Sequence, residues 1–346
     1  MLSVTINDGV LKRSDLGSDR KNKDKKSMKH VLKGDLVYNP MFMWKGASGI
    51  SAYEGITSAD YIVLKSKKNV NSIFFSHLFQ TKKSLNKFKN YSQGSLLERL
   101  RLMYPQFSDI KMTFPSYEEQ EKIANFLTSV DNKIELLEKK YQSSLDFKKY
   151  LMQQIFTQKL RFDFDDEWKT VKIKDIFNER SEKGFDDLEL LSVTLNEGVI
   201  KRFEIESKDN SNDNKSNYKH VLPNDIVYNS MRMWQGASGV SSYEGIVSPA
   251  YTILIPKNVY SPFFGYYFKT PEMIHQFKKY SQGLTSDTWN LKYPLISEIK
   301  MKIPSIDEQK EITKLFEAID VKIEILQNNL DEVTTFKKGL LQQMFI

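Results

Sequence analysis

The sequence contains no cysteine, which excludes disulfide bonds, thiolate metal ligands and a cysteine nucleophile. A protein without cysteine fits a reducing compartment. The first residues lack the basic stretch and following apolar stretch of a signal peptide. No apolar run approaches the roughly 18 residues that a membrane-spanning helix needs. We therefore expect a cytoplasmic protein that has no contact with a membrane.

Sequence motifs of the common catalytic sites are also missing. There is no phosphate-binding GxxxxGK[ST] loop, no GxGxxG, no HExxH and no GxSxG. The Asn-Pro-Pro-Tyr and Asp-Pro-Pro-Tyr tetrapeptides of amino-methyltransferases are absent as well. The four histidines, His30, His77, His220 and His275, are scattered, and their favoured interpretation is a core or turn position. The sequence thus predicts no catalytic residue, no metal ligand and no enzymatic activity for this chain.

The size and charge of the chain leave several classes open. Its 346 residues, 40% of them hydrophobic and 27% charged, are enough for two domains with separate cores. The formal net charge of +7 suits a nucleic-acid partner, although many ordinary proteins carry as much.

The chain is an internal repeat. LSVTINDGV begins at Leu2 and LSVTLNEGV at Leu191, and most positions of 29–58 are identical in 219–248. A period of this length is too long for a solenoid unit and indicates a duplicated domain. The segment Leu160–Glu189 precedes the second copy and has no counterpart before the first.

Each copy ends in the same way. Ile110–Phe114 and Ile299–Ile303 alternate apolar and polar residues, which predicts a half-buried strand in each copy. A proline ends each strand. Ser116 and Ser305 then begin predicted helices as N-caps of capping boxes, with a glutamate three residues later.

The two predicted helices carry a narrow heptad stripe, which is typical of a coiled coil. A helix of some 40 residues would be about 60 Å long. Mutual antiparallel pairing is the favoured interpretation, and packing of each helix on its own domain is the alternative. The stripe consists of Ile123, Leu127, Val130, Ile134 and Leu137 in the first helix, and of Ile312, Phe316, Ile319, Ile323, Leu326 and Leu330 in the second.

The most similar part of the two copies is a loop, MFMWKGASGISAYEG at 41–55 and MRMWQGASGVSSYEG at 231–245. Its glycines permit positive φ and close approach of a partner. Trp44 and Trp234 supply an aromatic face, and a variable residue, Lys45 or Gln235, follows each tryptophan. Lysine can bind guanine or phosphate, and glutamine can bind adenine. The alternative is a tight turn between strands with tryptophan in the core.

Basic and polar residues gather around this loop in the sequence, and we interpret them as a DNA-binding set. Two polar arms, Arg20–Lys26 and Ser207–Asn217, fit phosphate contacts, although such charge runs are often only solvated faces. The copies diverge locally between Ser95–Arg99 and Leu284–Thr288, where we expect different sequence readout. The candidates are Lys12, Arg13, Asn39, Lys45, Ser48, Lys82, Lys83 and Arg99 in the first copy, and Lys201, Arg202, Asn229, Arg232, Gln235, Ser238, Lys278 and Lys279 in the second.

The ordered set of motifs resembles the specificity subunits of Type I restriction–modification enzymes. It includes Pro-Ser-x-x-Glu-Gln-x-x-Ile at 115–123 and 304–312, the Phe-Lys-Lys and Gln-Gln-x-Phe endings at 147–156 and 336–345, and WKTVKIKDIF from Trp168. The resemblance covers essentially the whole chain. It implies an α+β fold with two pseudo-twofold-related α/β target recognition domains, separated by two long helices that pair as an antiparallel coiled coil. The implied parts are 1–115, 116–158, 159–304 and 305–346.

The resemblance also implies a function. Such a chain reads a bipartite target in double-stranded DNA without a cofactor of its own. It recruits two methyltransferase subunits, which use S-adenosylmethionine, and through them restriction and motor subunits, which use ATP and Mg. Members of the family normally open with the segment found here at 168–189. We therefore expect that the start is misassigned, that the first domain is truncated or recombined, or that another part of the assembly completes it. A structural or regulatory coiled-coil protein that binds other proteins is the alternative from another class.

Overall fold

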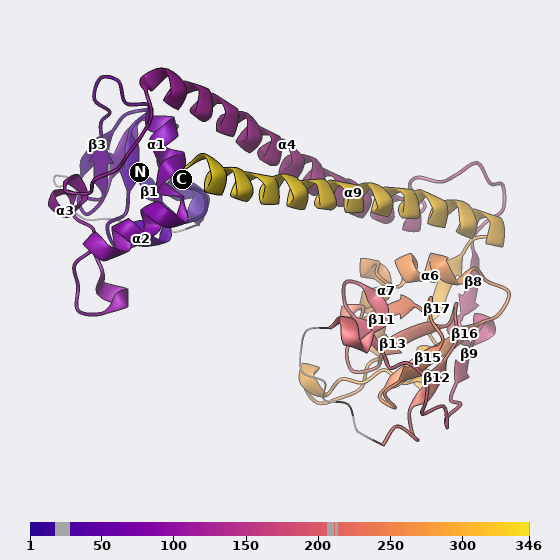
Figure 1. Ribbon diagram of the computed structural model, residues 1–346. Coiled ribbons are helices and arrows are strands. Elements are labelled where there is room, and N and C mark those ends of the chain that lie inside the picture. Colours follow the sequence, from indigo (N-terminus) through magenta and orange to yellow (C-terminus); the bar gives the residue numbers. More distant parts are fainter. Residues whose placement is uncertain (18–27, 206–210, 212–213, 346) are drawn as a thin grey trace. The chain divides into compact units, whose positions relative to one another are not determined.

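The computed structural model describes residues 1–17, 28–205, 211 and 214–345. The chain divides into two compact units (Figure 1). Unit 1 comprises Met1–Lys140 together with Leu326–Ile346, and unit 2 comprises Tyr141–Ile325. Each of the two long helices therefore begins in one unit and ends in the other.

Unit 1 is built from short antiparallel strands covered by helices. The hairpin β1 (Leu2–Val4) and β2 (Val10–Lys12) lies beside the pair β3 (Lys29–Val31) and β6 (Gly55–Thr57), and a three-stranded sheet has the order β5-β4-β7. The remaining elements are β4 (Leu36–Tyr38), β5 (Ser48–Ile50), β7 (Ile62–Leu64), α1 (Ser72–Phe79), α2 (Lys82–Tyr91), α3 (Tyr104–Ser108) and the first part of α4 (Tyr117–Phe156).

Unit 2 repeats this arrangement and also contains β8 (Lys169–Lys172), α5 (Ile173–Ile176), β9 (Phe177–Arg180) and β17 (Lys300–Ile303), which have no counterpart among the described elements of unit 1. Its central sheet has four strands in the order β14-β13-β16-β9, and β8 pairs with β17. The remaining elements are β10 (Leu191–Thr194), β11 (Gly198–Lys201), β12 (Lys219–Val221), β13 (Ile226–Asn229), β14 (Ser238–Val240), β15 (Gly245–Val247), β16 (Tyr251–Pro256), α6 (Ser261–Tyr267), α7 (Pro271–Tyr280), α8 (Tyr293–Ile296) and α9 (Ile306–Met344).

Local sequence explains where the short helices begin. The side chain of Asn71 accepts hydrogen bonds from the amides of Ile73 and Phe74 and so caps α1. Thr81 caps α2 and Thr270 caps α7 in the same way, through the amides of Ser84 and Met273. A side-chain acceptor at the N-cap satisfies amides that the first turn leaves without a partner, and it stabilises a helix by about 1 kcal/mol.

Aromatic residues dominate the core of each unit. In unit 1 the core centres on Phe74, Phe79 and Phe88 under the sheet, and Phe345 of the chain's last turn packs against Phe74 with ring centroids 5.2 Å apart. In unit 2 the larger core includes Phe263 and Phe264 of α6 and, from the additional segment, Trp168, Ile173 and Phe177.

The two long helices pair in an antiparallel manner within each unit. In unit 1, Ile123 and Leu127 of α4 share an apolar cluster with Met344 and Phe345 of α9, and Lys337 forms an ion pair with Asp131. In unit 2, Phe156 of α4 stacks on Phe316 of α9 with centroids 5.9 Å apart, and Lys148 pairs with Asp320. The helix pairing and the α+β fold predicted from the sequence are confirmed.

The alternative interpretation of the helices also holds in part. The first turns of each helix belong to the core of its own unit, where Leu127 and Phe316 are fully buried. The predicted stripe continues beyond these turns as half-buried residues: Ile134, Leu137, Ile323, Leu326 and Leu330. Each helix thus contributes to the core of one unit at its start and to the core of the other unit at its end, where Phe156 and Phe345 are buried.

Two expectations about local structure are wrong. Residues 110–114 form no strand, whereas their counterpart in unit 2 is β17. The physical reason is the missing partner, because β17 pairs with β8, and the described residues of unit 1 contain no equivalent of β8. The reciprocal capping box is also not formed at Ser305. Its hydroxyl accepts from the amide of Glu308 at 3.4 Å, but the Glu308 carboxylate accepts hydrogen bonds from Arg161 and Trp168.

Among the described residues, no helix has the length and apolar character that crossing a lipid bilayer requires.

Candidate nucleic-acid interface

The repeated loop connects two neighbouring strands of the sheet in each unit. It contains one 3₁₀ turn, Met43–Lys45 in unit 1 and Met233–Gln235 in unit 2. Gly46 and Gly236 follow with φ of 96° and 88°, a conformation that favours glycine. Met43 and Met233 are completely buried, so the methionine anchors the loop in the core and the residues around it face outward.

The tryptophans lie on the loop and are only half-buried. The indole N–H of Trp44 donates to the carbonyl of Met41 at 3.1 Å, and that of Trp234 donates to Met231 at 3.0 Å. These bonds fix each ring against its own loop. The alternative of a tryptophan fully in the core is therefore wrong, and each ring keeps part of its surface open.

Cations and aromatic rings are combined around both tryptophans. In unit 1 the ammonium groups of Lys45 and Lys89 lie 4.9 and 5.8 Å from the centroid of Trp44. In unit 2 Trp234 meets Trp289 edge to face at 5.2 Å, and Lys278 lies 5.5 Å from the centroid of Trp289. Such cation–π contacts hold lysine side chains in place while leaving the charge available to solvent.

The variable positions give the two loops different hydrogen-bonding groups. In unit 1 Lys45 is exposed and lies over Phe42 as well as Trp44. In unit 2 arginine replaces that phenylalanine, and Arg232 contacts the side-chain oxygen of Gln235 at 3.5 Å. One backbone frame therefore presents a single cation in unit 1 and an arginine–glutamine pair in unit 2.

A residue that the sequence analysis missed supports each loop from below. Gln80, which follows α1, donates to the carbonyl of Gly46 at 3.0 Å. Its counterpart Lys269 donates to the carbonyls of Gly236 and Leu195 at 2.7 and 2.8 Å. Burial lowers the pKa of Lys269 to about 8. The only signal in the sequence was the position of both residues directly before a repeated threonine.

Two predicted contact residues turn out to be structural. Ser48 and Ser238 are buried, with 4% and 1% of their surface exposed to solvent. The hydroxyl of Ser48 lies within hydrogen-bonding distance of Gln80, and that of Ser238 lies within hydrogen-bonding distance of the Gly236 carbonyl. Because these hydroxyls face the loop's own support, the expectation that they contact DNA is corrected. Asn39 and Asn229 are half-buried, and their side-chain oxygens accept from the amides of the second residue after them.

The hairpin that carries further candidates packs directly on the strand after the loop. A Cβ on Gly239 would lie 2.7 Å from the Cα of Gly198, so only glycine permits this approach. Lys12 lies 4.7 Å from the ring centroid of Tyr53, and Lys201 lies 5.2 Å from that of Tyr243. The predicted hairpin lysines are thus held in the same way in both units.

The arginines next to these lysines are half-buried. Arg13 contacts the sulfur of Met1 at 3.1 Å, and Arg202 donates to the carbonyl of Ile205 at 3.3 Å. The predicted arm Arg20–Lys26 lies outside the described residues, and so does most of Ser207–Asn217.

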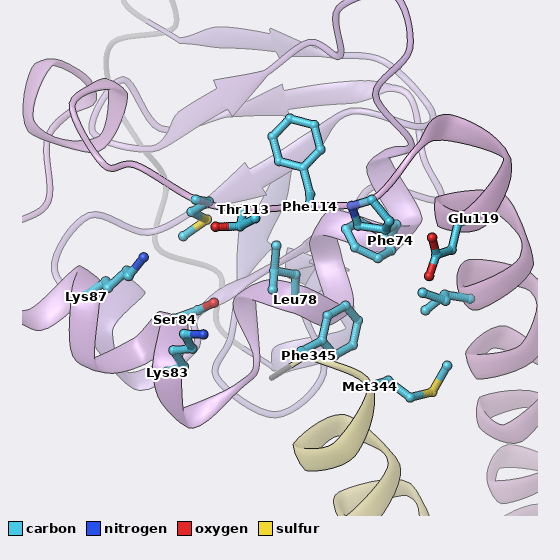
Figure 2. Close-up of a pocket in the computed structure, with 13 residues that line it drawn as sticks. Phe74, Leu78, Lys83, Ser84, Lys87, Thr113, Phe114, Glu119, Met344 and Phe345 are labelled. Atoms are coloured by element: carbon cyan, nitrogen blue, oxygen red, sulfur yellow. The ribbon is translucent and has the colours of Figure 1, made fainter.

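The predicted helix lysines fall into two groups. Lys278 and Lys279 lie in the last turn of α7, and Lys278 lies over the ring of Trp289. Lys82 and Lys83 lie in the first turn of α2, and Lys83 lines a hollow with Phe345 (Figure 2). Unit 1 places Lys89, not Lys83, beside its tryptophan.

The divergent patch forms a small loop in each unit. The bridges between Gln93 and Arg101 and between Gln282 and Asn290 close its base. Arg99 is exposed on this loop, and Leu284 is fully exposed at 101%. The two loops share a 3₁₀ turn at the same place and differ in their side chains, as expected for surfaces that contact different ligands. Trp289, next to the patch, was missed because the first copy has leucine there.

Comparisons with known proteins agree with this geometry. Residues 14–143 and 165–335 match the family described as Type I restriction modification DNA specificity domain. The chain is 23% identical over 337 residues to the Type I restriction enzyme MjaVIII specificity subunit of Methanocaldococcus jannaschii, with 87% of this chain and 76% of that protein covered. It is 24% identical to the putative MjaX specificity subunit of the same organism, with 97% and 84% covered.

Solved structures share the fold. The Type I restriction-modification S subunit from M. genitalium aligns with a TM-score of 0.57 and 15% identity, over 92% of this chain and 84% of that one. The HsdS subunit from Thermoanaerobacter tengcongensis aligns with a TM-score of 0.50 and 13% identity, over 93% and 83%.

Among the described residues, no group of three or more histidine and acidic side chains could hold a metal ion. The duplicated α+β units, the paired helices and the family match on both copies lead to one conclusion: this chain belongs to the Type I restriction modification DNA specificity family and is a non-catalytic specificity subunit.

Proposed function

We propose that each unit reads one half of a bipartite target in double-stranded DNA. The observation that carries the proposal is the duplicated loop, in which an identical backbone frame and buried methionine present different polar side chains. Direct readout of base edges requires a loop backbone of fixed conformation with side chains that can differ between the two units. Because the frames are so similar, the two half-sites should be related sequences.

The roles of the side chains follow from their chemistry. Gln235 and Arg232 would bind base edges in one half-site, and Lys45 and Arg99 would do so in the other, since glutamine suits adenine and arginine or lysine suits guanine. Asn39 and Asn229 would assist through the side-chain amide. The remaining cations would bind phosphates: Lys12, Arg13, Lys82, Lys83, Lys201, Arg202, Lys278 and Lys279.

The helices would set the distance between the half-sites and provide the surface for partners. We propose that two methyltransferase subunits bind the chain and bring S-adenosylmethionine, and that restriction and motor subunits, which use ATP and Mg, join through them. This work would take place in the cytoplasm. No cofactor is needed in this chain, because its role is to position the partners on DNA.

A loop exchange tests the reading role. The double substitution Arg232→Phe and Gln235→Lys gives unit 2 the variable residues of unit 1 while leaving Met233, Gly236 and Lys269 in place. The complex reconstituted with methyltransferase subunits should then methylate a target whose unit 2 half-site has moved toward the unit 1 half-site. Sequencing of methylated DNA reports the change.

Lys201→Ala serves as the control, because loss of a phosphate contact should lower methylation without changing the sequence. An unaltered methylated sequence in the loop-exchange complex would remove the loop from the reading surface. Methylation that never depends on the chain would favour a structural protein instead.

A further inference from the structure

Unit 2 contains a segment, Arg161–Arg180, that covers one side of its core and has no equivalent among the described residues of unit 1. The ring of Trp168 packs on Phe263 and Tyr267 at 6.3 and 6.4 Å. Ile173 and Phe177 are completely buried in the same core. The segment is therefore a core element of unit 2.

The corresponding surface of unit 1 is open. Two hollows of about 330 and 560 Å³ flank the extended residues 111–114, and both are lined by Met112 and Phe114. Phe114 is 49% exposed, whereas its counterpart Ile303 is 8% exposed. Figure 2 shows Phe74, Leu78 and Phe345 around the smaller hollow, with Glu119 on one side and Lys83 and Lys87 on the other. We call this surface the unit 1 groove: the two hollows and residues 110–119.

Backbone groups of the groove match the pairing seen in unit 2. There β8 pairs with β17, and the amide of Ile173 donates to the carbonyl of Ile299 at 3.0 Å. β9 extends the sheet beyond β16. In unit 1 the equivalent stretch at 110–114 has no strand partner among the described residues, and β7 is bonded only to β4. Unpaired edges of this kind are templates for strand addition.

The charges of the groove are complementary to the same segment. In unit 2 the buried Glu308 accepts hydrogen bonds from Arg161 at 2.8 and 2.9 Å and from the indole of Trp168 at 3.2 Å. Arg180 pairs with Asp225 at 2.8 Å, and Glu298 pairs with Lys172 at 2.7 Å.

The equivalent carboxylates of unit 1 are Glu119, Asp35 and Asp109. Within the described part of the chain, none of the three has an ion-pair partner, and Glu119 and Asp109 are exposed. Each carboxylate that receives a cation or an indole from the segment in unit 2 thus has a counterpart in unit 1, and two of the three counterparts are exposed.

We propose that the unit 1 groove binds a strand–helix–strand segment from outside residues 1–346 with the pattern Arg-x₆-Trp-x₂-Val-x-Ile-x₂-Ile-Phe-x₂-Arg, which completes the domain. The pattern is that of 161–180 in unit 2, where the same surface is covered. A second copy of this chain is a poor donor. Its segment is already buried in its own unit 2, and donating it would open an identical groove there.

A synthetic peptide with the sequence of residues 161–183 is the probe. Added to the full chain, it should bind with a stoichiometry of one, and hydrogen exchange should slow in residues 108–119 and 61–66 of unit 1 while unit 2 stays unchanged. The same peptide with Trp168→Ala should bind with an affinity at least about tenfold lower, because a buried tryptophan dominates such contacts.

Variants of the chain localise the site. Glu119→Lys should reduce peptide affinity, because it places a cation opposite the arginine of the peptide, and Glu119 is exposed, so folding should survive. Glu138→Lys, an exposed position later on α4, is the matched control and should bind as the unmodified chain does. A chain with residues 160–189 fused before Met1 should no longer bind the peptide, since its groove is filled.

Several results would overturn the proposal. They are equal binding of the Trp168→Ala peptide, protection in unit 2 in place of unit 1, and undiminished binding to the fused chain. Concentration-dependent dimers that protect the groove without added peptide would assign it to a second copy. The DNA-reading proposal does not depend on any of these outcomes.

Discussion

The ammonium group of Lys269 donates a 2.7 Å hydrogen bond to the carbonyl of Gly236, the glycine that ends the 3₁₀ turn of the unit 2 loop. The same group reaches Leu195 in the neighbouring hairpin at 2.8 Å. Unit 1 places the neutral amide of Gln80 in this position. A charged group supports the loop in one unit and an uncharged group supports it in the other, so the two units should respond differently to pH.

Lys269→Gln should remove this difference. Burial lowers the pKa of Lys269 to about 8, below the value of about 10.4 in an unfolded chain. Between these values the unfolded state binds more protons, so the free energy of unfolding of unit 2 should rise with pH by an amount on the order of 3 kcal/mol. Denaturant unfolding from pH 7 to 10.5 measures it. The variant should lose the rise, and the exposed control Lys279→Gln should keep it.

Gln235→Ala should relax sequence specificity in one half-site only. Loss of a side chain that binds one base should cost about 1–3 kcal/mol of discrimination at that base pair. Binding of the complex to a set of single-base variants of its target measures this. Lys45→Ala is the matched change in unit 1 and should affect the other half-site. A uniform loss across all sequences from Gln235→Ala would make the residue part of the scaffold.

Lys82→Ala, Lys83→Ala and Lys278→Ala should each weaken binding to all DNA sequences alike. A phosphate contact carries no sequence information, and its loss should lower the salt dependence of log K by about 1. Titrations at several salt concentrations provide the slopes. Lys83→Ala is the most informative of the three variants, because Lys83 lines the unit 1 groove. An unchanged slope for Lys83→Ala alone would place that residue outside the DNA surface.

Phe316→Ala should destabilise unit 2 strongly. The ring is fully buried and lies 5.1 Å from Tyr266 and 5.9 Å from Phe156. Truncation of a buried phenylalanine typically costs about 3–5 kcal/mol through lost burial and the cavity left behind. Val321→Ala on the same helix removes a side chain that is 55% exposed and should have little effect. Thermal unfolding of both variants compares them, and equal losses would contradict the described packing.

The sequence predicted the fold well where a pattern was local and repeated. The heptad stripe located both long helices and their pairing, because apolar positions such as Leu127 and Phe316 follow helical periodicity wherever they pack. Local periodicity was not enough to predict whether Ile110–Phe114 forms a strand. Its alternation is the same as in unit 2, but a strand also needs a neighbour, and that neighbour comes from a distant segment.

The candidate site was predicted in outline. The repeated loop with Trp44 and Trp234 was found, because duplication made it visible. The buried Ser48 and the supporting Lys269 were not assigned correctly, since nothing in a linear pattern shows which hydroxyl faces inward or which lysine reaches back to a backbone carbonyl. The assignment of individual side chains to bases or phosphates stays a prediction.

The division of the chain into units has a consequence for its synthesis. Unit 2 is one uninterrupted stretch, Tyr141–Ile325, whereas unit 1 needs Leu326–Ile346 in addition to the first 140 residues. Phe345, which is synthesised after the whole of unit 2, completes its core. Domains tend to fold in the order in which they leave the ribosome. In this chain most of unit 1 is synthesised first, but its core is completed only when the last turn of α9 has been synthesised. Until then, the incomplete core of unit 1 has to be kept from aggregating.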